Sequence, residues 1–207
     1  MNSTDGRIAS LKMHNVSLSL LVLCLMAVPA RAQQQQTIYD NGPVNGQVNA
    51  RTINYGYAVT DSFFNNNGLL YSSSVSFWVW LFPGDTLANV EVSFGSHPYG
   101  TDIYDGYFNP VLTNCFYNRY AYNVCQASVY FYAYPPYGIS WLTVQNAQVP
   151  SGNPVLWDQN SGVGCMSQGC PSHALQKQAG GVLPTAGVPS DSFTIVGYQV
   201  VGNQHAR

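Results

Sequence analysis

Side chains that could act as nucleophiles are present in the chain, but their spacing forms no known nucleophile motif. The nearest match to G-x-S-x-G is GCMSQG at 164–169, where Ser167 has the wrong spacing. The histidines beyond the N-terminal segment, His97, His173 and His205, are the only candidate bases of this type, and His97 and His173 lie in turn-like settings. Solvated loop histidines are typical of such settings, so the sequence predicts no catalytic triad.

Carboxylates for acid–base chemistry are also few. Glycoside hydrolysis needs two carboxylates on either side of a sugar, and Glu91 is the only glutamate in the chain. The aspartates mostly lie in turn sequences, such as Gly84-Asp85 and Asp105-Gly106. This setting predicts turn and cap roles for them rather than catalysis.

Two oxygen-rich segments could bind a metal ion. The segment DQNSG at 158–162 resembles the first half of a calcium loop, but the later glutamate of such a loop is missing. Asp102 and Asp105 form a second group beside Gly106. Asx turns explain both segments without a metal, so we expect no cofactor. Asp158 and Asn160 are the candidate ligands if a structural calcium ion is bound.

Tyrosine is the residue type in excess, with fifteen in the chain and ten of them within residues 99–137. On a strand expected at 121–134, Tyr130, Tyr132 and Tyr134 share one face and the apolar residues between them take the other. Three rings spaced in this way make a row about 13 Å long. This length suits two or three sugar units.

An aromatic row can bind a glycan because rings stack on the C–H faces of sugars while hydroxyl groups bond to the sugar's own. Trp80 would extend the row if its strand lies alongside. The alternative is that the tyrosines only stabilise the sheet through cross-strand pairs. Both interpretations remain open at this point.

Four cysteines follow the N-terminal segment: Cys115, Cys125, Cys165 and Cys170. An even number in an exported chain indicates disulfides, and we favour the local pairs Cys115–Cys125 and Cys165–Cys170. A zinc site is disfavoured because the spacings do not match zinc knuckles.

Residues 1–32 have the features of a cleaved secretory signal. Basic residues come first, an apolar run follows, and Ala30-Arg31-Ala32 matches the pattern that a signal peptidase recognises. The sequence therefore predicts cleavage after Ala32 and a secreted or periplasmic location. No second long apolar segment follows, so we expect no membrane span in the mature chain.

Charge excludes nucleic acid as a partner. The mature chain would keep four of the seven basic residues and eight of the nine acidic ones, so its net charge is about −4. A nucleic-acid-binding protein needs a basic patch instead. Neutral polar ligands such as glycans are compatible with this composition, and the oligomeric state is left open.

Short β-rich segments separated by Gly, Pro and Asn predict an all-β fold, an antiparallel β-sandwich. Alternation is clearest at 75–82, where Val75, Phe77, Val79 and Leu81 share one face. The strand that contains this segment is expected at 70–82, and other strands are expected at 52–62, 89–94, 104–108, 139–145 and 192–200. We expect a flexible Gln-rich lead-in at 33–37 and one domain at 38–207, with a long irregular segment at 150–189.

Five short motifs carry a resemblance: IYDNG at 38–42, WLFPGDTL at 80–87, WLTVQNA at 141–147, NPVLWDQNSG at 153–162 and PSDSF at 189–193. Together they resemble an uncharacterised family of exported bacterial β-sandwich proteins, many of which end in a PEP-CTERM-type sorting anchor. The resemblance covers most of residues 38–200. It implies a jelly-roll-like fold and a location outside the cytoplasm, without any activity.

The sequence thus favours an exported, non-enzymatic β-sandwich that acts as an envelope or matrix component and binds carbohydrate. The candidate ligand-binding residues are Tyr130, Tyr132, Tyr134 and Trp80. The alternative is a small secreted hydrolase with an unrecognised Ser/His/Asp or paired-Asp site.

Overall fold

The computed structural model describes residues 34–47, 49–66, 70–160, 167–170, 172–178, 181–183 and 191–199. This part of the chain is built from strands and contains no helix. The strands are β1 Gln35–Asp40, β2 Ala50–Thr52, β3 Tyr57–Asn65, β4 Leu70–Leu81, β5 Asn89–Gly95, β6 Tyr104–Phe108, β7 Val111–Tyr117, β8 Asn123–Ala133, β9 Gly138–Gln148, β10 Leu156–Asp158, β11 Ala174–Gln178, β12 Gly181–Leu183 and β13 Phe193–Gln199. The expected signal segment at 1–32 lies outside these residues.

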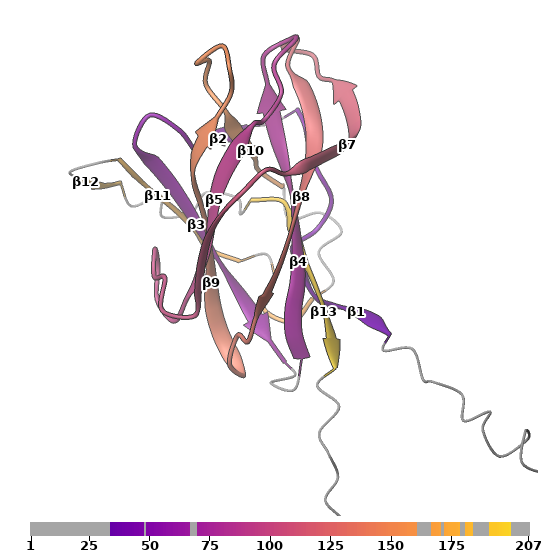
Figure 1. Ribbon diagram of the computed structural model, residues 1–207, viewed down its shortest axis with the longest axis vertical. Coiled ribbons are helices and arrows are strands. Elements are labelled where there is room, and N and C mark those ends of the chain that lie inside the picture. The colour runs from indigo at the N-terminus through magenta and orange to yellow at the C-terminus, as the bar shows by residue number, and fades with distance from the viewer. Residues whose placement is uncertain are drawn as a thin grey trace, which may run out of the picture. The chain divides into compact units, whose positions relative to one another are not determined.

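The strands form two antiparallel sheets, with β4 and β8 on one side of the domain and β3, β5 and β9 on the other (Figure 1). In the seven-stranded sheet, β8 pairs with one edge of β4, while β13 and β10 follow one another along the opposite edge. In the six-stranded sheet the order is β12-β11-β3-β9-β5-β6. The predicted antiparallel β-sandwich is therefore confirmed.

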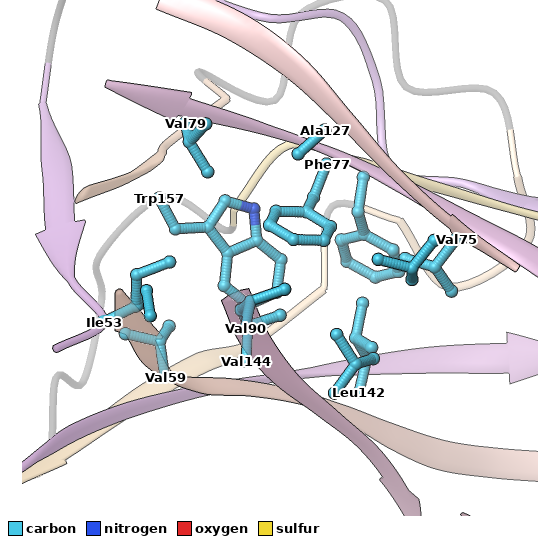
Figure 2. Close-up of a cluster of buried hydrophobic side chains, with 14 of the residues drawn as sticks. Ile53, Val59, Val75, Phe77, Val79, Val90, Ala127, Leu142, Val144 and Trp157 are labelled. Carbon is cyan, nitrogen blue, oxygen red and sulfur yellow. The ribbon is translucent and has the colours of Figure 1, made fainter. Parts of the chain in front are cut away.

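Alternation along β4 directs one set of side chains into the space between the sheets. Val75, Phe77, Val79 and Leu81 are fully buried there, as the sequence predicts. Trp157 of β10 is also fully buried and packs edge-on against Phe77 at 5.9 Å (Figure 2). Removing a large aromatic side chain from such a core costs about 3–5 kcal/mol.

Two turns show why the strands end where they do. Pro83 and Gly84 close a turn in which the amide of Asp85 donates to the carbonyl of Phe82 at 3.0 Å, and Gly84 has a φ of 87°. The predicted strand at 52–62 is instead divided by a turn at Tyr55, whose φ is 55°. The chain therefore leaves β2 in one sheet and enters β3 in the other.

Several strands were not expected from the sequence. β1 begins at Gln35, inside the segment expected as a flexible lead-in, because its backbone pairs with β13. β10 and β11 lie within 150–189, the segment expected to be irregular, and each pairs with a long strand. Their burial depends on partners far away in the chain, which local composition does not encode.

Candidate functional site

The outer face of the seven-stranded sheet presents a row of tyrosines along β8. Tyr130, Tyr132 and Tyr134 are 66%, 72% and 66% exposed. Phe131 and Ala133, which lie between them, are buried in the core. The three rings share one face, as the alternation predicts, and this face points outward. Ligand binding by them stays a prediction.

Two tyrosines from neighbouring strands join this row. Tyr71 of β4 contacts Tyr132, Tyr134 and Tyr198, with ring centroids 5.7, 5.8 and 5.6 Å apart. Tyr198 belongs to β13, so the contacts cross three adjacent strands. We call Tyr71, Tyr130, Tyr132, Tyr134 and Tyr198 the tyrosine face. Tyr71 thus contacts three of the other four rings of the face.

Irregular pairing shapes the sheet beneath these rings. β8 has one more residue than β4 between the pairs Ser72–Ala133 and Ser74–Tyr130, which is the pattern of a β-bulge. A second irregularity lies between Val196 and Gly197 of β13. Bulges increase the local twist of a strand and re-aim its side chains. Both irregularities lie next to residues of the tyrosine face.

The three strands that carry the tyrosine face are uncharged. None of the strands β4, β8 and β13 contains a charged residue. Further along the same face, Ser76 and Ser128 hydrogen-bond across the strands at 2.8 Å, and both are partly exposed. A neutral face with hydroxyl groups suits a neutral polar ligand better than an ionic one.

Trp80, expected to extend the row, is not available to a ligand. It is 5% exposed, and its indole N–H donates to Oδ1 of Asp158 at 2.6 Å. Its ring stacks on Tyr120, with centroids 6.0 Å apart. Trp80 pairs with Val124, near the opposite end of β8 from Tyr134. Trp80 is therefore not part of the tyrosine face.

The expected metal candidates are already engaged in hydrogen bonds. The carboxylate of Asp158 accepts the backbone amides of Asn45 and Gly46, both at 2.9 Å, as well as the Trp80 N–H. Asn160 donates its side-chain amide to the backbone carbonyls of Asn41 and Asp191. Burial raises the pKa of Asp158 to about 6. Asp158 therefore acts as a buried hydrogen-bond acceptor that holds parts of the fold together.

Ser96, His97 and Asp102 come together on the loop after β5, but not in the order of a catalytic triad. The Nδ1 atom of His97 lies 3.3 Å from the Ser96 hydroxyl and 3.7 Å from Oδ1 of Asp102. A triad needs the two partners on different ring nitrogens. The imidazole is 67% exposed, which fits the expected solvated loop.

An acidic pair that the sequence did not reveal lies on the outer face of the six-stranded sheet. Glu91 of β5 accepts the side-chain amides of Gln145 at 2.7 Å and Asn146 at 2.6 Å. Asp105 is in β6 rather than in a turn, opposite Ser93 and diagonal to Glu91. Tyr107 lies directly opposite Glu91.

The two carboxyl groups of this pair are not equivalent. Burial would raise the pKa of Glu91, but hydrogen bonds from Tyr107, Asn146 and Gln145 outweigh it, so the pKa is lowered. Burial and the neighbouring charge of Glu91 raise the pKa of Asp105. Carboxyl groups whose pKa values are pushed apart are typical of acid–base pairs.

One predicted disulfide is present, between Cys115 of β7 and Cys125 of β8. Cys170 is also disulfide-bonded, and its expected partner, Cys165, lies outside the described residues. The Cys115–Cys125 bond ties the mostly exposed strand β7 to the buried strand β8.

The fold and the tyrosine face define the protein as an antiparallel β-sandwich with an exposed aromatic platform. No protein-family model matches the chain, and no match is found among curated proteins or solved structures. Within the ranges that the structure covers, no helix is long and apolar enough to cross a membrane.

Proposed function

We propose that the mature chain is an exported, non-enzymatic protein that binds a neutral carbohydrate through the tyrosine face. The observation that carries this proposal is the exposure of Tyr130, Tyr132 and Tyr134, at 66–72%, on an uncharged sheet face. Three exposed rings of one type on one face form an apolar patch, and such patches on soluble proteins mark interaction sites. Export is supported by the signal-like segment 1–32 and by the Cys115–Cys125 disulfide, since disulfides persist in oxidising compartments.

The tyrosine side chain fits this ligand class. A ring supplies flat apolar area for the C–H face of a sugar, and its hydroxyl is both a donor and an acceptor. Tyr71 restrains Tyr132 and Tyr134 through ring contacts, so little conformational entropy is lost when a sugar stacks on them.

Glycan-array screening of the mature chain, followed by affinity electrophoresis with the best ligand, tests the proposal. Tyr132→Ala should abolish retention and change the free energy of unfolding by less than about 1 kcal/mol, because the ring is outside the core. Tyr117→Ala is the matched control, since Tyr117 is 68% exposed on β7. Unchanged retention in Tyr132→Ala, or a stability loss of about 3–5 kcal/mol, would contradict the proposal.

A second candidate function is hydrolysis of a glycosidic bond at Glu91 and Asp105. Asp105, with its raised pKa, would protonate the leaving oxygen, and the ionised Glu91, which is 7% exposed, would stabilise the positive charge that develops on the sugar. Release of reducing sugar from a polysaccharide panel measures this activity. Glu91→Gln should abolish it and Tyr132→Ala should only weaken it, while an inactive wild-type chain removes the candidate.

A further inference from the structure

A second aromatic group lies on the same outer face of the seven-stranded sheet as the tyrosine face. Trp78 of β4 pairs with Gln126 of β8, and the pair Ser76–Ser128 lies between them and Tyr130. These side chains alternate with the buried core residues of the same strands, so they point outward. Gln126 and Tyr130 lie four positions apart on β8, a distance of about 13 Å along the strand.

Trp78 is open to a ligand in a way that Trp80 is not. It is partly exposed, and its ring packs against Phe116 of β7, with centroids 6.1 Å apart. Phe116 is itself 38% exposed. The described contacts give the indole N–H of Trp78 no acceptor, whereas the N–H of Trp80 donates to Asp158. Trp78 therefore offers both a ring and a free hydrogen-bond donor.

Polar groups lie between the two aromatic groups. The side-chain oxygen of Gln126 accepts from the side-chain amide of Asn114 at 2.7 Å. This bond orients the amide group of Gln126, whose nitrogen has no acceptor among the described residues. Ser76 and Ser128 bond to each other at 2.8 Å. Because each hydroxyl has one donor and two lone pairs, this pair keeps one O–H and several lone pairs for another partner.

We call these four residues, Ser76, Trp78, Gln126 and Ser128, together with the tyrosine face, the extended face. From Gln126 to Tyr134 it is about 26 Å long, twice the length of the tyrosine row. The tyrosine row suits two or three sugar units, so the extended face has room for about five. It ends at Trp78, because the next outward pair, Trp80 and Val124, is buried. The strands β4, β7, β8 and β13 contain no charged residue.

We propose that the extended face binds a linear, neutral polysaccharide, about five sugar units at a time. This inference rests on the proposed function, since the tyrosine face supplies half of the surface. The rings at both ends stack on the C–H faces of separate sugar units. Between them, the amide nitrogen of Gln126 and the hydroxyls of Ser76 and Ser128 bond to the hydroxyl groups of the intervening units. A mono- or disaccharide would reach only one of the two aromatic groups.

The test measures affinity against ligand length. The mature chain is titrated by isothermal titration calorimetry with the three-unit and five-unit members of the cello-, xylo-, manno- and malto-oligosaccharide series. In a series that binds, the five-unit member should bind about tenfold more tightly, because only it reaches Trp78. Equal affinities for the two lengths would overturn the extended face and leave the proposed function standing. Absence of binding in all four series would also overturn it, while binding of a short or branched glycan on the array would still support the tyrosine face.

Variants separate the two halves of the surface. Trp78→Ala should lower the affinity for the five-unit ligand to that for the three-unit ligand and leave the latter unchanged. Gln126→Ala, at a partly exposed position, should act in the same direction and replaces Trp78→Ala if that variant does not fold. Tyr132→Ala should lose both ligands, and Tyr117→Ala, at a 68% exposed position on β7, should keep both. A preference for the longer ligand that persists in folded Trp78→Ala and Gln126→Ala chains would overturn the proposal.

Discussion

Tyr130 and Trp80 project from the same face of the seven-stranded sheet, and what covers each ring decides its role. The register pairs Trp80 with Val124 and Ser74 with Tyr130, so both rings lie on the side opposite the core. The loop carrying Asn45 and Gly46 reaches the same carboxylate as the Trp80 indole, and Trp80 becomes buried. No such contact covers Tyr130. The position of an aromatic side chain on the outer face of a sheet therefore does not by itself predict a binding role.

The hydrogen bond from Trp80 to Asp158 can be tested directly. Trp80→Phe keeps the stacked ring and removes the donor, so the carboxylate of Asp158 keeps only its two backbone amide partners. The expected loss in the free energy of unfolding is about 1–2 kcal/mol, measured by urea denaturation. Trp78→Phe is the control, because the described contacts give its indole N–H no acceptor. Equal losses in the two variants would show that ring size, not the hydrogen bond, sets the effect.

At the scale of the strands, β13 and β4 approach unusually closely next to the tyrosine face. A Cβ atom added at Gly197 would lie 2.0 Å from the carbonyl oxygen of Tyr71 and 2.6 Å from Cδ1 of Ile38. Real Cβ atoms do not come so near to backbone. Gly197 thus permits the pairing that places Tyr198 beside Tyr71.

Gly197→Ala should therefore displace the strand that carries Tyr198 and change the tyrosine face. The backbone of β13 must shift away from β4, which separates Tyr198 from Tyr71 and loosens the ring cluster. We expect a stability loss of about 1–3 kcal/mol and weaker glycan retention. Urea denaturation and affinity electrophoresis measure the two effects. The control is Gly84→Ala, whose added Cβ meets no atom within 4 Å. It adds backbone strain in a turn, where φ is 87°, and should leave retention unchanged.

How far the sequence predicts these elements depends on whether a strand carries its own pattern. β4, β5, β6 and β8 alternate or are bounded by turn residues, and their residue ranges follow from the sequence within a few positions. The three-residue strand β10 has no pattern of its own, because it exists only by pairing with β2 and β4. The same reason explains why β1, rich in glutamine, was expected to be flexible.

The candidate sites divide in the same way. Alternation within one strand is enough to predict that Tyr130, Tyr132 and Tyr134 share one face. The Glu91–Asp105 pair depends on the register between two strands. The buried contact in which the Asp191 backbone amide donates to the Asp61 carboxylate joins residues 130 positions apart. Neither register nor long-range contact can be derived from local spacing. The burial of several aspartates could therefore not be predicted from the sequence.

At the scale of the whole molecule, the core holds more negative charge than its cations compensate. Asp61, Asp158 and Asp191 are fully buried, and Arg51 is the only buried cation among the described residues. Burial raises the pKa of each of the three carboxyl groups. Folding therefore depends on the protons that neutralise these groups.

Stability should fall as the pH rises. A raised pKa means that the folded state binds protons more tightly than the unfolded state, so the stabilisation is complete below the unfolded pKa near 4 and is lost through the folded pKa. For Asp158 the change from 3.8 to about 6 corresponds to about 3 kcal/mol. Asp61 and Asp191 add a change of the same sign. Urea denaturation from about pH 4 to about pH 8 measures the slope. Stability that rises across this range would show that the buried aspartates are compensated without a proton.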